Sequence, residues 1–279
     1  MDPSADSPQP PGGVPARALA IAAGLPPSRV QVVDSIGSTN LALMRADWGP
    51  ALDGPRVLLA RQQTEGRGRR GRVWLSGGDE SLTLSVCLEL PLPEGGAQLT
   101  GLSVRAGVEV AECLAGLTGG LALKWPNDLQ RHGRKVAGLL CESRLQADRV
   151  RVVAGLGINL LPAGHLLDQI GQPAGTLFDT PADLPDRWRL AGLIAAALLR
   201  GVGGDHKQAP LPDRWAAFDA LAGAPVVVLA EGAPALAGIA DGIEPDGALR
   251  LRMGDTVQRI SVGEVSLRRQ PDAAAAAPP

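Results

Sequence analysis

Two patterns predict an α+β fold, with a mixed sheet and flanking helices, followed by a small all-β barrel. Strand-like and helix-like segments alternate up to about residue 222, whereas only short strand-like segments separated by turn residues follow Gly223. The 279 residues and a hydrophobic content of 45% are enough for one substantial domain and a smaller second one.

The first elements are expected to run strand, helix, strand. Residues 29–34 and 56–63 are short apolar runs that predict strands. Between them, residues 38–48 predict a helix, because Ser38 or Thr39 can serve as its N-cap.

The next part of the chain carries the strongest periodic signals. Residues 81–90 have leucine or valine at every even position, which predicts a strand with one apolar face. Apolar residues at spacings of three and four between Leu102 and Leu117 predict a helix that Gly119 ends. Three further strands are expected at 121–125, 135–145 and 149–160, and two helices at 185–200 and 212–221.

Composition and turn signals suggest the domain boundaries. Residues 1–28 are rich in proline and glycine and are expected to be disordered, as are the alanine- and proline-rich residues 271–279. The α+β domain is assigned to residues 29–222. The barrel is assigned to residues 223–270, where short strands alternate with turns such as Glu-Pro-Asp-Gly at 244–247.

Charge and cysteine usage argue against several kinds of protein. The formal net charge is −2, so the chain as a whole is not a polyanion binder, and a local arginine cluster becomes more informative. Three widely spaced cysteines without a Cys-x-x-Cys pair argue against a disulfide framework and a zinc site. The cysteine usage predicts a reducing, cytoplasmic setting. The N-terminus lacks a signal-peptide pattern, and without a long apolar run no membrane span is expected.

The segment TEGRGRRGRVW at 64–74 contains a Gly-x-Gly-x-x-Gly pattern. A dinucleotide-binding fingerprint needs a helix directly after its glycines, but two more glycines and a predicted strand follow here. Four arginines within six residues instead predict a glycine-hinged loop that becomes ordered on an anion. The loop alone leaves three interpretations open: a solvated charge run, a nucleic-acid contact, or a site for a small phosphorylated ligand.

Two later segments add polar groups beside buried strands. Trp-Pro-Asn-Asp predicts a turn that exposes Asn127 and Asp128 at its tip, whether as a plain hairpin loop or as part of a site. Lys135 begins an apolar strand, either as a solvated end or as a cation aimed at an anionic substrate. The glycines at 155–160 bring Asn159 to the end of a buried run, where a backbone can approach a ligand closely.

Taken together, these segments resemble the biotin protein ligase family. The resemblance rests on five blocks in the family's order and spacing, and it covers nearly everything from residue 29 to residue 270. The blocks are DSIGSTN at 34–40, QTEGRGRRGRVW at 63–74, LKWPNDL at 123–129, KVAGLLCE at 135–142 and GLGINL at 155–160. The resemblance implies a class II synthetase-like catalytic fold, shared by biotin and lipoate ligases, and an SH3-like C-terminal barrel.

The resemblance also implies a two-step reaction. Biotin and ATP with Mg²⁺ would give biotinyl-5′-AMP and pyrophosphate. The biotinyl group would then pass to one lysine of a biotin carboxyl carrier protein or domain of an acetyl-CoA or acyl-CoA carboxylase. The nucleophiles are the biotin carboxylate and the carrier lysine, so the enzyme aligns groups and neutralises phosphate charge. The resemblance does not identify ligands for Mg²⁺.

Individual residues acquire roles from the resemblance. Hydrogen bonds to the ureido ring of biotin are expected from Ser38, Thr39 and Asn40, a run that also suits a plain helix cap. Gln63 would lie beside the biotin site. Lys135 would contact the biotin carboxylate and the α-phosphate, which makes it the main catalytic candidate.

The arginine loop is expected to act as a lid that becomes ordered over biotinyl-AMP and shields it from water. Arg67, Gly68 and Arg69 would close over biotin and the phosphate, and the two arginines are further catalytic candidates. Trp74 would offer the nucleotide a stacking surface. The expected ATP contacts are Arg69, Arg72, Trp74, Asn127, Asp128 and Asn159.

Two other functions were considered for this chain. The first is a lipoate or octanoate ligase or transferase, which shares the catalytic fold, but a fatty-acyl pocket needs no hydrogen-bond partners for a ureido ring. The second is a nucleic-acid-binding module, which fits poorly with the net charge of −2 and an aromatic content of 3%.

Too few residues precede the catalytic domain for a three-helix DNA-binding domain, so no operator binding is expected. The family includes monomers and dimers, which leaves a homodimer open.

Overall fold

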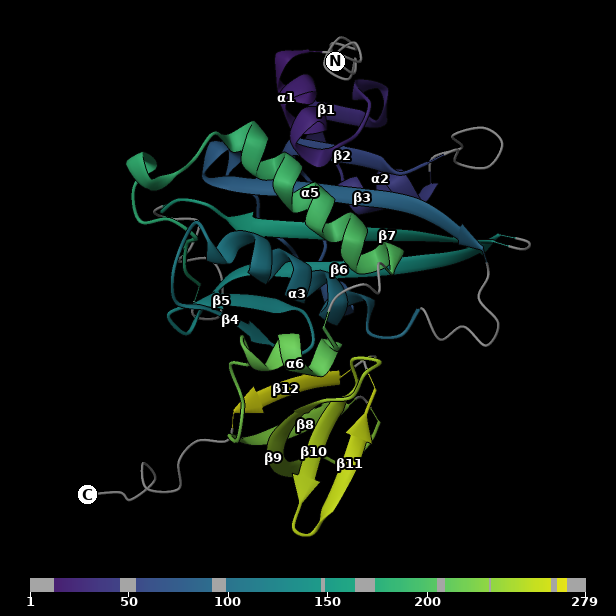
Figure 1. Ribbon diagram of the computed structural model, residues 1–279, viewed down its shortest axis with the longest axis vertical. Coiled ribbons are helices and arrows are strands. Elements are labelled where there is room, and N and C mark those ends of the chain that lie inside the picture. The colour runs from purple at the N-terminus through teal and green to yellow at the C-terminus, as the bar shows by residue number, and fades with distance from the viewer. Residues whose placement is uncertain are drawn as a thin grey trace.

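The computed structural model describes residues 13–45, 54–91, 99–146, 149–163, 174–204, 209–230, 232–261 and 265–269. Within these ranges the chain forms a seven-stranded mixed sheet and a five-stranded antiparallel sheet (Figure 1). The predicted α+β fold and the all-β C-terminal unit are both confirmed. The predicted disorder of residues 271–279 concerns a segment that lies outside the described residues.

The large sheet has the strand order β1-β2-β3-β7-β6-β5-β4. Strands β1 and β2 pair in parallel, and the remaining neighbours in this order pair antiparallel. The strands are β1 (Val30–Ile36), β2 (Arg56–Gln63), β3 (Ser81–Pro91), β4 (Leu121–Lys124), β5 (Asp128–Arg131), β6 (Arg134–Gln146) and β7 (Arg149–Asn159).

Helices cover both faces of this sheet (Figure 1). Helices α1 (Val14–Ala23), α3 (Leu102–Ala115) and α5 (Arg187–Gly203) lie on one face, and α2 (Thr39–Arg45) lies on the other. The short 3₁₀ turns are η1 (Pro27–Arg29), η2 (Arg69–Gly71), η3 (Gly78–Glu80) and η5 (Pro181–Asp183). No helix in the described part of the chain is long and apolar enough to cross a membrane.

Side chains alternate along β3 and β7, so the two faces of the large sheet carry different sets of residues. Leu84 and Leu156 join the main core beneath α3 and α5. On the other face, Cys87 and Val153 form a small apolar cluster with Leu43 of α2. That cluster occupies only part of the α2 face, which leaves neighbouring positions of the same strands for polar side chains.

Helix α1 corrects the expectation that residues 1–28 are disordered. Its buried face consists of Ala16, Leu19 and Ala20. This face packs on α5 at Gly192, where a Cβ would overlap the backbone of α1. Proline in the first turn and Gly24 in the left-handed conformation (φ 68°) are ordinary helix-end signals, so the composition of this segment concealed a helix.

Strand β5 is a second departure from the expected elements. The sequence predicts a single turn between the strands at 121–125 and 135–145, but the chain makes two successive hairpins there. Four residues, Asp128–Arg131, form the strand between the two turns. So short a segment carries too few alternating positions to be recognised as a strand.

The C-terminal unit has the strand order β11-β10-β9-β8-β12. Its strands are β8 (Pro225–Ala230), β9 (Leu236–Ile243), β10 (Leu249–Met253), β11 (Thr256–Ile260) and β12 (Val265–Arg269). The turn at 244–247 docks against the large domain, where the Trp125 indole N–H donates to the Gly247 carbonyl at 3.0 Å. Gly101 makes this approach possible, because a Cβ there would overlap the backbone of Asp246.

Helix α6 (Leu211–Ala216) connects the two units. Glu109 of α3 is 6% exposed and accepts hydrogen bonds from Arg214 of α6 at 2.7 Å and from Arg200 of α5 at 2.8 Å. A buried carboxylate needs such compensation, so the bond from Arg214 holds α6 against α3. Helix α6 in turn contacts β9, which positions the C-terminal unit below the sheet (Figure 1).

Candidate active site

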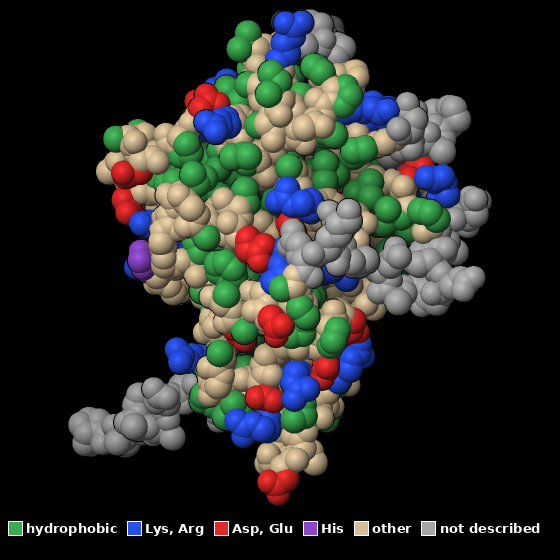
Figure 2. Space-filling model, viewed as in Figure 1, with side chains coloured by type: hydrophobic (Ala, Val, Ile, Leu, Met, Phe, Trp, Pro, Cys, Tyr) green, Lys and Arg blue, Asp and Glu red, His purple; other side chains and the backbone are tan. Residues whose placement is uncertain are grey.

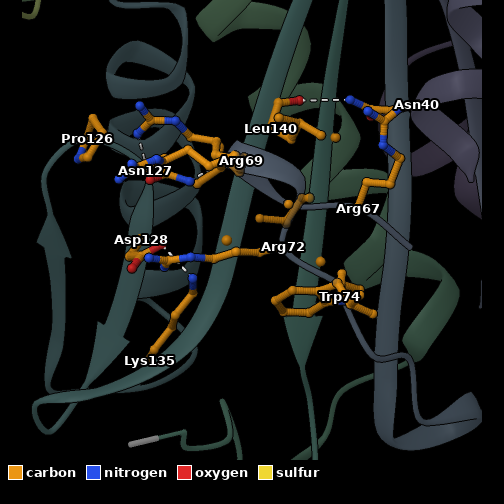
Figure 3. Close-up of a pocket in the computed structure, with 18 of the residues that line it drawn as sticks. Asn40, Arg67, Arg69, Arg72, Trp74, Pro126, Asn127, Asp128, Lys135 and Leu140 are labelled. Carbon is orange, nitrogen blue, oxygen red and sulfur yellow. Dashed lines mark hydrogen bonds and ion pairs between the residues drawn. The ribbon is translucent and has the colours of Figure 1, made fainter. Parts of the chain in front are cut away.

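One pocket gathers the polar residues that the sequence singled out. It has a volume of about 920 Å³ and lies on the α2 face of the large sheet, with β12 contributing to its wall. Figure 3 shows lining side chains that extend into it from the arginine loop and from the strands. All of the predicted biotin and ATP contacts line it: Ser38, Thr39, Asn40, Gln63, Arg67, Gly68, Arg69, Arg72, Trp74, Asn127, Asp128, Lys135 and Asn159.

The arginine loop folds back on itself at this pocket. The Gly68 N–H donates to the Arg72 carbonyl at 2.7 Å, which closes the loop around η2. Arg70 (φ 57°) and Gly71 (φ 69°) are both left-handed, a conformation that suits glycine and is strained for arginine. Every residue between this turn and β3 is described and none is α-helical, which confirms the argument against a dinucleotide fingerprint.

Arg69 reaches from the loop to the opposite wall (Figure 3). Its Nη1 donates to Asn127 Oδ1 at 3.2 Å, and Asn127 Nδ2 donates to the Leu139 carbonyl at 2.8 Å. Asn127 and Asp128 are therefore not exposed at a turn tip, as the sequence predicts, but half-buried. The reason is that the turn closes against β6 and Asp128 already belongs to β5.

Lys135 and Asp128 form an ion pair inside the pocket (Figure 3). The distance from Nζ to Oδ1 is 2.7 Å, and the two side chains are only 19% and 21% exposed. Of the two interpretations that the sequence left open, the structure favours the partly desolvated cation over the solvated strand end.

Positive charge dominates the lining. Among the described residues that line the pocket, Asp128 is the sole acidic one. The basic ones are Arg67, Arg69, Arg70, Arg72, Lys124, Lys135 and Arg268. Such an excess in a concave site attracts a small polyanion. Arg268 was not expected, because no local pattern indicates that β12 returns to this wall.

The residues at the start of α2 are buried at the other part of the pocket. Ser38, Thr39 and Asn40 are 3–5% exposed. Ser38 Oγ accepts from the Leu41 N–H at 3.4 Å, so the predicted capping role is confirmed for Ser38. The Thr39 N–H donates to Gln63 Oε1 at 2.8 Å, which brings Gln63 beside this run.

Two glycines of β7 allow side chains to lie directly on the sheet. A Cβ on Gly155 would overlap Asn40 Oδ1, and a Cβ on Gly157 would overlap the Trp74 ring. The sequence predicts a close approach at these glycines, and here the approach is made by the protein's own side chains. Asn159 ends the same strand, where its Nδ2 donates to the Gly175 carbonyl at 3.1 Å.

Among the described residues, neither a thiol nor a metal-binding cluster of side chains contributes to the pocket. Burial raises the pKa of Cys87 to about 11 and that of Cys141 to about 12, so thiolates are scarce at neutral pH. No cysteine is among the residues that line the pocket. Across the described ranges, no cluster of three or more His, Cys, Asp or Glu side chains could hold a metal ion.

Comparison with known proteins matches both units of the chain. Residues 32–159 match the model of the Biotin/lipoate A/B protein ligase family. Residues 222–268 match the model of the Biotin protein ligase C terminal domain. The first range contains nearly all of the pocket's loops and strands, and the second contains β8 to β11 and β12 except for its last residue.

Individual relatives extend over most of the chain. The biotin--[acetyl-CoA-carboxylase] ligase of Mycobacterium tuberculosis is 33% identical over 254 residues, or 88% of this chain and 91% of the relative. The bifunctional ligase/repressor BirA of Escherichia coli is 34% identical over 243 residues, which are 86% of this chain and 74% of that relative. The structure of a biotin protein ligase from Aquifex aeolicus in complex with biotin and ATP aligns with a TM-score of 0.70 at 27% identity, covering 87% of this chain and 99% of that one. The chain therefore belongs to the biotin protein ligase family.

Proposed function

We propose that this chain is an ATP-dependent biotin protein ligase, which makes biotinyl-5′-AMP and transfers biotin to a lysine of a biotin carboxyl carrier protein or domain. One observation carries the proposal: a single pocket joins a buried polar run, Ser38 to Asn40, to a cationic wall that contains Lys135. The polar run suits an uncharged ring with hydrogen-bonding groups, and the cationic wall suits phosphate. Family membership supports the same assignment.

In the first step, a biotin carboxylate oxygen attacks the α-phosphorus of ATP. The bond from the α-phosphorus to the oxygen that bridges it to the β-phosphate breaks, and pyrophosphate leaves. Both reactants are anions, so the residues' main contribution is to hold them together against their repulsion. We assign this task to Lys135, which Asp128 keeps in place, and to Arg67 and Arg69 of the lid.

In the second step, the carrier lysine attacks the carbonyl carbon of the mixed anhydride. AMP leaves with the electron pair of the bond between carbonyl carbon and phosphate oxygen, and the lysine nitrogen loses a proton as the amide forms. No nucleophile from the enzyme is needed. The pocket therefore has to hold the anhydride dry until the carrier arrives.

Magnesium fits this pocket as a companion of ATP. Mg²⁺ usually keeps several waters and binds substrate phosphates together with one or two carboxylates. Asp128 is the one carboxylate that the described part of the chain contributes to the lining, and it is already paired with Lys135. We infer that Mg²⁺ would enter together with ATP and would be held mainly by the triphosphate and water, with Asp128 as the carboxylate available to it from the described lining.

Replacing Arg69 with glycine is expected to let biotinyl-AMP escape and label lysines of bystander proteins. Arg69 spans from the loop to Asn127, so its loss opens the lid while leaving the polar run intact. Mass spectrometry of an added bystander protein measures the labelling. Arg61→Ala is the control, since it removes the same charge at an exposed surface pair with Asp79. Labelling confined to the carrier in Arg69→Gly would show that the lid account is wrong.

Calorimetric titration tests the proposed function itself. The protein is titrated with biotin, and then with biotin plus a non-hydrolysable ATP analogue. Binding of biotin, with residues 64–74 becoming protected from protease, is the expected result. No biotin binding at millimolar ligand would overturn the proposal, and binding of octanoate or lipoate in its place would favour the acyl-transferase alternative.

The nucleic-acid alternative gains little support from surface charge. On the face seen in Figure 2, basic and acidic side chains are interspersed over the C-terminal unit. Arg250 pairs with Glu244 at 2.9 Å, and Arg259 pairs with Asp246. These arginines are partly neutralised, so we propose that the chain binds no operator DNA. Sequence-specific DNA retention at physiological salt would contradict this.

The proposal also covers where the enzyme is located in the cell and whether it forms a dimer. We place the enzyme in the cytoplasm, because its three cysteines are free thiols, as in a reducing compartment. A homodimer is the alternative to a monomer. Light scattering of the purified protein, with and without biotin, distinguishes the two states.

A further inference from the structure

The side-chain amide of Asn40 has one orientation that satisfies its neighbours. Its Nδ2 lies 3.0 Å from the Leu140 carbonyl oxygen and 2.8 Å from Glu142 Oε2. A carbonyl and a carboxylate can only accept hydrogen bonds. The amide must therefore present its N–H groups to them, and this turns Oδ1 toward Ser85.

That orientation determines how Ser85 uses its hydroxyl. Ser85 is fully buried on β3, with its Oγ 2.6 Å from Asn40 Oδ1. Since Oδ1 can only accept, Ser85 gives its single hydroxyl proton to Asn40. Ser85 Oγ also lies 2.7 Å from Thr39 Oγ1, and with its proton already used it must accept there, so the Thr39 hydroxyl donates.

The direction of the Thr39 hydroxyl leaves one hydrogen-bond donor and one acceptor on two residues that line the pocket, Gln63 and Thr39. Its proton is used on Ser85, so Gln63 Oε1 is held by the Thr39 backbone N–H at 2.8 Å rather than by the hydroxyl at 3.1 Å. Gln63 is then left with Nε2 as a donor, and Thr39 Oγ1 keeps a lone pair as an acceptor. A cyclic urea, with N–H donors flanking a carbonyl acceptor, matches such a pair.

We propose that Glu142 is a positioning residue that sets this donor and acceptor pattern, acting through Asn40, Ser85 and Thr39. Glu142 is not among the residues that line the pocket, so it acts without touching the substrate. Its negative charge strengthens the bond from Asn40 compared with a neutral acceptor. The inference rests on the proposed function, because it takes the residues around Thr39 as the site of the ureido ring.

Replacing Glu142 with alanine removes one of the two acceptors that orient Asn40. The Kd for biotin is expected to rise about tenfold, the loss typical of one charge-assisted hydrogen bond. The Kd for a non-hydrolysable ATP analogue should not change. Glu142→Gln is expected to restore most of the biotin affinity, since its Oε1 can still accept from Asn40. The control is Arg144→Ala, an exposed position two residues along the same strand.

Two biotin analogues distinguish loss of the donor and acceptor pattern from general structural damage in Glu142→Ala. Desthiobiotin keeps the ureido ring and lacks the thioether, so Glu142→Ala should weaken its binding as much as that of biotin. 2-Iminobiotin carries an N–H donor where biotin has its carbonyl acceptor. 2-Iminobiotin should bind the parent protein weakly, and Glu142→Ala should change that affinity little. Because only biotin binding weakens, the preference for biotin over 2-iminobiotin is expected to fall about tenfold.

The outcomes distinguish this inference from the function it rests on. If the parent protein binds no biotin, the proposed function itself fails. If the parent binds biotin and Glu142→Ala binds it equally well, the positioning role is wrong while the function stands. Equal weakening of biotin, 2-iminobiotin and the ATP analogue in Glu142→Ala would also overturn it, because that result indicates structural damage.

Discussion

Replacing Lys135 with methionine is expected to slow biotinyl-AMP formation by about 10²–10³-fold, the usual loss when one preorganised group is removed from a developing charge. Lys135 is 19% exposed and lies 2.7 Å from Asp128, so its ammonium group is in place before the substrates bind. Methionine keeps a similar length without the charge, which should preserve packing. Pyrophosphate release in the presence of biotin and ATP measures the rate.

The transfer step serves as an internal control for this variant. When synthetic biotinyl-AMP is supplied, Lys135→Met should still biotinylate the carrier, because Lys135 is assigned to the first step. Arg134→Met removes the same charge from the neighbouring exposed position and should leave both steps unchanged. Adenylation by Lys135→Met at the parent rate would contradict the catalytic assignment.

Alanine at Gly155 and alanine at Gly157 are expected to cause two separable binding defects. A Cβ at Gly155 would displace Asn40 and weaken biotin binding, whereas a Cβ at Gly157 would displace the Trp74 ring and weaken ATP binding. Overpacking of this kind costs about 1–3 kcal/mol, which corresponds to roughly five- to 150-fold in Kd. Calorimetry with each ligand alone measures both constants.

Gly116→Ala is the matched control for these two variants. Gly116 has φ −78°, and apart from its own neighbours in the chain no atom lies within 4 Å of the point that an alanine Cβ would occupy, so alanine fits there without strain. If Gly155→Ala and Gly157→Ala lose both ligands to the same extent, the division of the pocket into a biotin part and a nucleotide part is incorrect.

Much of the fold was predictable because its signals are local. The alternation in residues 81–90 identified β3, since one face of that strand packs on helices. Ser38 identified the start of α2 because a short hydroxyl side chain can satisfy a free backbone N–H. The resemblance supplied the candidate site residues, and the structure brings them together in one pocket.

The site residues that the sequence did not predict depend mostly on long-range contacts. Glu142 meets Asn40 only because α2 packs over β6 and β7, a contact between segments about a hundred residues apart in the chain. Arg268 reaches the pocket only because the C-terminal unit docks through Gly101 and Gly247. Ser85 had a detectable signal: it is polar and lies opposite the apolar face of a strand that is buried on both sides.

Biotin transfer to an apo carrier domain, followed by intact-mass spectrometry, tests the proposed ligase activity most directly. With biotin, ATP and Mg²⁺, one biotin is expected on a single carrier lysine. Without ATP, or with octanoate in place of biotin, the carrier mass should not change. An unchanged carrier with all three components present, or octanoyl transfer in preference to biotin, would contradict the assignment of this chain as a biotin protein ligase.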